Sequence, residues 1–97
     1  MSKASAIRKS AKGQDCQVRL NGICNHNPET VVLAHLNGAG MAMKHDDMFG
    51  AYACSDCHDA IDRRHNRALE RDYVRLAHLD GMVRTQKILL SMGLIKL

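Results

Sequence analysis

The cysteines of this chain, together with one histidine, are the residues whose spacing points most directly to chemistry. Cys54 and Cys57 are separated by two residues, and His58 follows the second of them. Two thiolates at this spacing can bind one tetrahedral metal ion. Cys16 and Cys24, the two remaining cysteines, can complete a set of four sulfur ligands. The sequence therefore predicts a structural zinc site made of four cysteines.

Two other uses of the cysteines have to be weighed against zinc. The pattern from Cys54 to His58 also matches c-type haem attachment, and paired cysteines can form disulfides. Both usually follow export, whereas residues 1–14 are basic and polar and lack the apolar segment of a secretory signal. Haem would also leave Cys16 and Cys24 without a role. We therefore favour zinc in a cytoplasmic protein, with His58 as an alternative zinc ligand.

The overall composition predicts one small domain with a basic surface. The chain has 97 residues, and 14 Lys and Arg against 10 Asp and Glu give a net charge of +4. This excess suits a polyanionic partner, and six histidines can add charge when protonated. No apolar run is long enough to cross a bilayer, so we expect no membrane partner. Aromatic residues are scarce, which favours helices packed on a small sheet over a β-sandwich.

Local patterns predict an α+β order of elements within one domain, 1–97. Hydrophobic periodicity and turn residues give the boundaries. The expected elements are a basic helix ended by Gly13, a turn at 21–22 that brings Cys16 and Cys24 together, strands over 30–36 and 48–53, and helices from residue 56 onward. We divide the domain into a basic N-terminal helix (1–13), a zinc-stapled ββα core (14–65) and C-terminal helices (66–97).

The C-terminal part is expected to hold two helices, because Asp80-Gly81 is typical of a break followed by a helix cap. The first helix would carry an apolar stripe of Ile61, Leu69, Tyr73, Leu76 and Leu79. The second would run to about residue 92, end at Gly93, and bury Met82, Val83, Ile88, Leu89 and Met92. We expect His26, His65 and His78 to be exposed to solvent.

Two histidines and two carboxylates could support phosphodiester hydrolysis. This reaction needs a base that activates water and a divalent cation that stabilises charge on the phosphorane. His35, at the end of the first predicted strand, is the candidate base, because imidazole is available as a base near pH 7. His58 and Asp62 are four residues apart on a helix and could bind one cation. Asp47 could be another ligand or could orient His35, and Asp62 could instead pair with a neighbouring arginine.

With these features the chain resembles the HNH endonucleases, and among them the phage and prophage group that includes YbcO. The resemblance covers residues 11–62 by motif and extends to the segment 81–86. It implies a ββα-metal (His-Me finger) fold in which His35 is the first histidine, Asp47 the middle position and His58 the last histidine. It also implies that Cys16, Cys24, Cys54 and Cys57 bind structural Zn²⁺, and that Mg²⁺ or Mn²⁺ is the catalytic cation.

DNA is the partner that the resemblance and the basic charge imply. Arg8 and Lys3 add to the charge of the first helix, and the residues expected to contact nucleic acid are Lys9, Lys12, Lys44, Arg63 and Arg64. The alternative to an endonuclease is a non-catalytic, zinc-stabilised module that binds nucleic acid or protein. Ala34 stands where many such nucleases have a metal-binding residue, and Asp47 stands where Asn is more usual, which keeps this alternative open.

Overall fold

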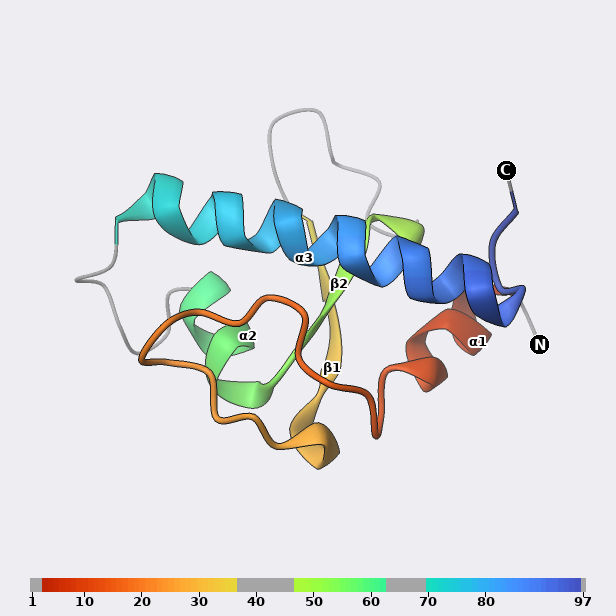
Figure 1. Ribbon diagram of the computed structural model, residues 1–97, viewed down its shortest axis with the longest axis horizontal. Helices are drawn as coiled ribbons and strands as arrows, with labels where there is room; N and C mark the ends of the chain where they lie inside the picture. Colours follow the sequence, from red (N-terminus) through yellow and green to blue (C-terminus); the bar gives the residue numbers. More distant parts are fainter. Residues whose placement is uncertain (1–2, 37–46, 63–69, 97) are drawn as a thin grey trace.

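The computed structural model of the chain confirms a small α+β fold, and it describes residues 3–36, 47–62 and 70–96 (Figure 1). The elements in chain order are α1 (Lys3–Ser10), η1 (Pro28–Thr30), β1 (Val32–His35), η2 (Asp47–Phe49), β2 (Gly50–Ala53), α2 (Ser55–Ile61) and α3 (Arg71–Met92). A two-stranded hairpin is packed against the long C-terminal helix α3. In the described part of the chain, none of the helices has the length and apolarity that crossing a bilayer requires.

The hairpin is antiparallel, and its register places His35 at the end where β1 finishes and β2 begins. Ala34 pairs with Ala51, and His35 pairs with Gly50. The alanines of the hairpin are fully buried, and their small side chains allow α3 to cross closely over this face (Figure 1). At Gly50 a side chain would collide with Leu33, because an added Cβ would lie 2.8 Å from the Leu33 Cγ. The glycine opposite His35 is therefore required by packing.

The outer edge of β2 is capped by groups from distant parts of the chain. The Tyr52 N–H donates to the Thr85 hydroxyl of α3 at 2.9 Å, and the Tyr52 carbonyl accepts from the Gln17 N–H at 2.8 Å. Because an edge strand otherwise leaves its backbone polar groups unpaired, these bonds take the place of a third strand. They also fix the hairpin between α3 and the loop that carries Cys16.

Helix α3 runs through Asp80 and Gly81 without a break, so the predicted start of a new helix there is wrong. Gly81 is needed for close approach, because a Cβ at this position would lie 3.0 Å from the Gln17 carbonyl oxygen and from Val18. The predicted end of the helix at Gly93 is confirmed, since this residue is the C-cap and has φ of 75°. The C-terminal region therefore holds one long helix instead of two.

The buried stripe of α3 differs from the predicted one because two of its members are polar. Its buried residues are Val74, His78, Gly81, Thr85 and Leu89. Tyr73, Leu76, Val83 and Met92 were expected to be buried, and all four are exposed. A pattern of apolar residues alone cannot find this stripe, because His78 and Thr85 are buried through the hydrogen bonds they make to the hairpin.

His78 joins α3 to the strand that carries the candidate base. It was expected in solvent but is only 4% exposed, and its Nε2 lies 2.8 Å from the Ala34 carbonyl oxygen. Burial lowers the pKa of His78 below the ordinary histidine value. The neutral ring therefore carries its proton on Nε2, donates to Ala34, and holds the backbone next to His35.

Helix α1 lies near the C-terminal end of α3 (Figure 1), where it contacts the buried Tyr52. The Ser10 hydroxyl and the Tyr52 hydroxyl are 2.7 Å apart, and Ile7 and Ala11 are buried in the core. The helix is followed by a turn in which Gly13 has φ of 87°, a conformation that glycine adopts without steric cost. The predicted basic helix is therefore confirmed, with α1 ending three residues before Gly13.

The burial of neutral His78 predicts a loss of stability in mild acid. The unfolded chain takes up a proton below a pH of about 6.5, and the folded chain takes it up only at lower pH. The free energy of unfolding should therefore fall as pH decreases from neutral through the ordinary histidine range. His78→Gln should keep a donor to Ala34 and show a smaller fall in urea titrations at pH 7.5 and 5. His78→Leu should lose about 1–3 kcal/mol at pH 7.5, because the buried bond between α3 and Ala34 is lost, and it should also show a smaller fall toward pH 5, because it removes the titrating ring. An unchanged acid response in both variants would contradict this explanation.

Candidate functional site

The four cysteines converge on one point, as the spacing predicted. Their ligand atoms all lie within 4.8 Å of one another, and the Sγ atoms of Cys24 and Cys54 are 3.8 Å apart. A tetrahedral ion with Zn–S bonds of about 2.3 Å places its sulfurs roughly 3.8 Å apart. The cysteines are free thiols, three of them buried. The cluster is thus compatible with a structural zinc, and Cys16 and Cys57 complete its ligand set.

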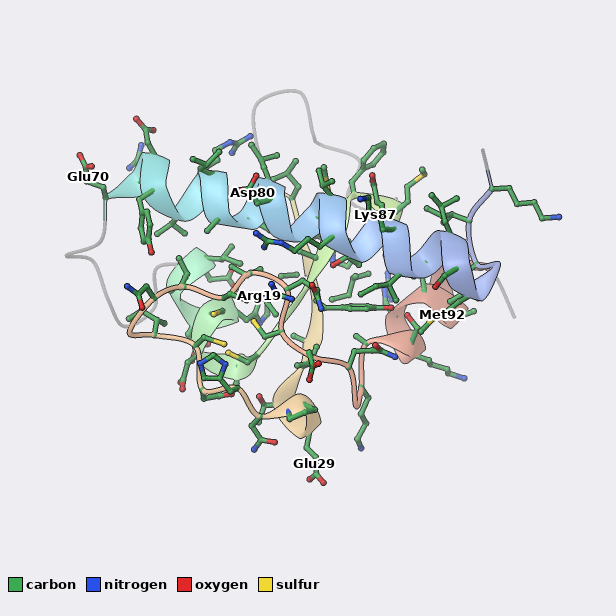
Figure 2. The ribbon with its side chains drawn as sticks, in the orientation of Figure 1. Arg19, Glu29, Glu70, Asp80, Lys87 and Met92 are labelled. Atoms are coloured by element: carbon green, nitrogen blue, oxygen red, sulfur yellow. The ribbon has the colours of Figure 1, made fainter. Side chains whose placement is uncertain are left out.

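Backbone N–H groups donate hydrogen bonds to the sulfurs. These bonds favour the thiolate form, which is the form that binds a cation. The Arg19 N–H donates to Cys16 at 3.5 Å, and the N–H groups of Asn25 and Cys57 donate to Cys54 at 3.4 Å. Arg19 has φ of 53°, a left-handed conformation that is unusual for a residue with a side chain. Its side chain lies between the N-terminal loop and α3 (Figure 2). The strained turn at Arg19 is therefore explained by the bond that its N–H gives to the sulfur.

The protonation of the cluster also favours a metal. A hydrogen bond from Cys57, helped by the Arg19 N–H, lowers the pKa of Cys16 to about 4. Burial raises the pKa of Cys24 to about 11, and the bond to Cys16 together with burial raises the pKa of Cys57 well above the ordinary range. Four thiolates cannot coexist this closely without a positive ion between them, and a divalent cation supplies that charge.

A second group of polar side chains meets at the end of the hairpin where β1 finishes and β2 begins. The Nε2 atom of His35 lies 2.5 Å from the Oδ1 atom of Asp47, whose side chain is fully buried. The Nε atom of Arg8, on α1, lies 3.3 Å from the other carboxylate oxygen. That oxygen is buried and, among the described residues, accepts no hydrogen bond of good geometry. Since the His35 side chain is 24% exposed, the imidazole is the part of this group that solvent can reach.

The structure places Asp47 against the His35 ring, which is the contact that the second of its two predicted roles requires. Its hydrogen bond orients the His35 ring, and its burial makes it a poor ligand for a cation that enters from solvent. Sequence reasoning counted Arg8 only among the basic residues of α1, because nothing local links it to a carboxylate 39 residues away. A buried carboxylate requires a polar or cationic neighbour, but the burial of Asp47 is visible only in the structure.

The predicted cation ligands form a pair of their own. The Nε2 atom of His58 lies 3.5 Å from Asp62 on α2, and both side chains are partly exposed. Within residues 3–36, 47–62 and 70–96, the four cysteines are the only group of three or more metal-binding side chains close enough to share an ion. The described geometry therefore presents His58 and Asp62 as two ligands, and His58 is not part of the cysteine cluster.

The predicted nucleic-acid residues are placed only in part. Lys9 and Lys12 lie exposed on or just after α1, near Arg8. Lys44, Arg63 and Arg64 lie outside the described residues, as do His45, Asp46 and His65. His26 is exposed as expected, although its Nδ1 lies 3.6 Å from the Cys24 sulfur.

The hairpin, the short helix directly after it and the four converging cysteines define a small, cysteine-clustered α+β protein. The chain belongs to the family described as "Putative nuclease YbcO", which matches residues 5–94. Nucleases described as putative in Escherichia coli (strain K12) and in Enterobacteria phage 82 are each 47% identical over 93 residues, which is 93% of this chain and 96% of theirs. A solved structure of a putative bacteriophage protein from Escherichia coli K-12 is 48% identical, with a TM-score of 0.78, and covers 91% of this chain and 100% of its own.

The cluster geometry predicts about one tightly bound zinc ion per chain, with folding coupled to binding. Cys57→Ser should lose the metal and the cooperative unfolding transition, because three sulfurs and a buried hydroxyl cannot replace the site. Asp56→Asn is the matched control, since it changes an exposed residue between the two cysteines without removing a sulfur. Metal analysis and thermal melts test both variants. A zinc-free Cys57→Ser protein with an unchanged sharp melt would contradict the structural role.

Proposed function

We propose that this chain is a metal-dependent endonuclease that hydrolyses phosphodiester bonds in DNA. The observation that carries the proposal is the bond between His35 Nε2 and the buried carboxylate of Asp47. A carboxylate can only accept, so the imidazole carries its proton on Nε2 and keeps a lone pair on Nδ1. This arrangement fixes the tautomer that a general base requires.

The proposed reaction follows from this tautomer. His35 Nδ1 takes a proton from a water molecule, whose oxygen attacks the phosphorus while the opposite P–O ester bond breaks. The imidazolium that forms is stabilised by Asp47, whose negative charge is held in place by the Arg8 guanidinium. Because both groups are positioned before the reaction, little reorganisation is needed when the charge appears.

His58 and Asp62 would hold the catalytic cation, for which Mg²⁺ or Mn²⁺ is proposed. Such an ion supplies stabilisation of the negative charge on the phosphorane and on the leaving oxygen. An imidazole and a carboxylate four residues apart on α2 suit this role, and their partial exposure leaves room for water and phosphate ligands. The family description as a nuclease supports the same reaction class.

The alternative is a zinc-stabilised module that binds nucleic acid or protein without cleaving it. It is favoured by one observation, namely that the described residues offer only two side chains for a catalytic cation. Ala34, buried under α3, cannot provide a third. Wild-type protein that binds DNA but stays inert with every divalent cation would establish this alternative.

Substitution of the base and of the cation ligand should separate their roles. His35→Ala should lower kcat by about 10²–10⁴-fold, because the base acts only in the transition state. Zinc content and DNA affinity should not change, and added imidazole should restore part of the activity. His58→Ala should also lose activity, but this variant should respond to higher Mn²⁺ or Mg²⁺ instead of imidazole.

Asp47→Asn tests the orientation of the ring. The amide can donate to Nε2 and thereby favour the wrong tautomer, so kcat should fall while KM stays near the wild-type value. Nicking of supercoiled plasmid under single-turnover conditions measures all three variants. Cleavage that survives His35→Ala unchanged would remove this residue from the mechanism.

A further inference from the structure

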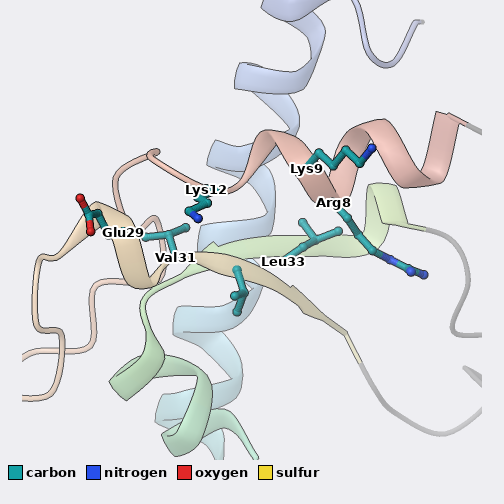
Figure 3. A pocket seen from close by; sticks show the side chains of 7 residues that line it. Arg8, Lys9, Lys12, Glu29, Val31 and Leu33 are labelled. Atoms are coloured by element: carbon teal, nitrogen blue, oxygen red, sulfur yellow. The ribbon is translucent and has the colours of Figure 1, made fainter. Parts of the chain in front are cut away.

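A groove between α1 and β1 opens beside the candidate active site. It has a volume of about 530 Å³ (Figure 3). The residues that line it are Arg8, Lys9, Lys12, Glu29, Val31, Val32 and Leu33. Its size is that of a site for a ligand of moderate size, and a groove open to solvent can also hold part of a longer chain.

The charges of the groove are divided between its two sides. Arg8, Lys9 and Lys12 all come from α1 and the turn after it, whereas Glu29 is the one acidic residue of the lining. Figure 3 shows Lys12 above Val31 and Arg8 extending past Leu33. A row of three cations along one side matches a linear polyanion better than a single compact anion. The apolar residues of β1 and the segment before it suit the less polar sugar rings of such a chain.

The groove lies next to the His35–Asp47 pair, to which Arg8 connects it. Leu33 precedes His35 by two residues on β1, so the two side chains lie on the same face of the strand. Arg8 belongs to both places, because it lines the groove and its Nε lies 3.3 Å from the Asp47 carboxylate. A strand bound along α1 would therefore reach the exposed imidazole without changing direction.

We infer that this groove binds the phosphate backbone of the DNA strand that is cut, on one side of the scissile bond. The inference rests on the proposed function and adds to it the path of the substrate. Lys12 and Arg8 contact successive phosphates, and Arg8 brings the strand to His35. Glu29 repels the backbone and limits the groove to one strand. The effect of each residue on binding is thus set by its position as well as by its charge.

Two matched pairs of substitutions test the groove separately from the net charge. Lys12→Gln is compared with Lys87→Gln, because Lys87 is exposed on α3, which covers the opposite side of the hairpin (Figure 2). Glu29→Gln is compared with Glu70→Gln, because Glu70 is exposed at the start of α3 and makes no side-chain cap bond. Within each pair the net charge changes equally. All four variants are made with His35→Ala, and binding to a labelled DNA duplex is measured by anisotropy from 0.05 to 0.4 M salt.

Lys12→Gln should weaken binding by about eightfold at 0.1 M salt and reduce the log–log salt slope by about 0.9, as expected for one lost phosphate contact. Glu29→Gln should strengthen binding by about twofold to fivefold. Lys87→Gln and Glu70→Gln should change the affinity much less. In the cleaving protein, Lys12→Gln should raise KM and leave kcat nearly unchanged, because this contact is made equally before and during the reaction.

Equal changes in DNA affinity within each pair would contradict binding in the groove. General electrostatic attraction would then explain the binding. Cleavage by the wild-type protein would remain in that case, so the proposed function would stand. Conversely, a wild-type protein that does not cleave, but whose pairs differ as expected, would overturn the proposed function and keep the groove as a DNA-binding site. Absence of binding at 0.05 M salt would overturn both.

Discussion

Convergence of four thiols is the constraint on which the rest of this structure depends. A chain of this size with so few aromatic residues has a limited core, and a metal ion bound by the cluster would compensate for that. The cluster ties the loop of residues 16–24 to the first turn of α2, immediately after β2. The same loop caps the edge of β2 through Gln17 and receives α3 at Gly81. Loss of the cluster would therefore release the hairpin as well as the loop.

The candidate site is built where three separate segments meet. β1 supplies His35, the 3₁₀ turn before β2 supplies Asp47, and α1 supplies Arg8. The hairpin fixes the first two relative to each other, and α3 fixes the hairpin through His78 and Thr85. Neither His78 nor Thr85 has a proposed role in the reaction itself. The rigidity of the pair thus comes from polar contacts that are buried within a largely aliphatic core.

Sequence reasoning found the parts of the structure that are encoded locally. The spacing of Cys54 and Cys57 and the glycine at position 93 depend on short-range geometry, and both predictions agree with the observed arrangement. The strands were found within two residues, because β-branched residues before His35 are a strong local signal.

What the sequence could not reveal depends on contacts between distant residues. His78 and Thr85 are polar, so their burial is visible only when their partners on the hairpin are known. Gly81 was expected to break the helix, but it lies within α3, where the lack of a side chain allows Gln17 and Val18 to approach closely. No local sequence pattern indicates the contact between Arg8 and Asp47, which are 39 residues apart. The proposed role of His58 and Asp62 remains a prediction, since proximity on one helix turn follows from their spacing alone.

The dependence of the hairpin on α3 has a consequence for the synthesis of the protein. The residues of the candidate site all precede α3 in the chain, so they leave the ribosome before the helix that fixes their strands. Contacts of such long sequence separation form late in folding, because loop closure must precede them. A nascent chain that stops before α3 therefore contains every motif residue but no rigid site. The site therefore becomes rigid only after α3 has been made.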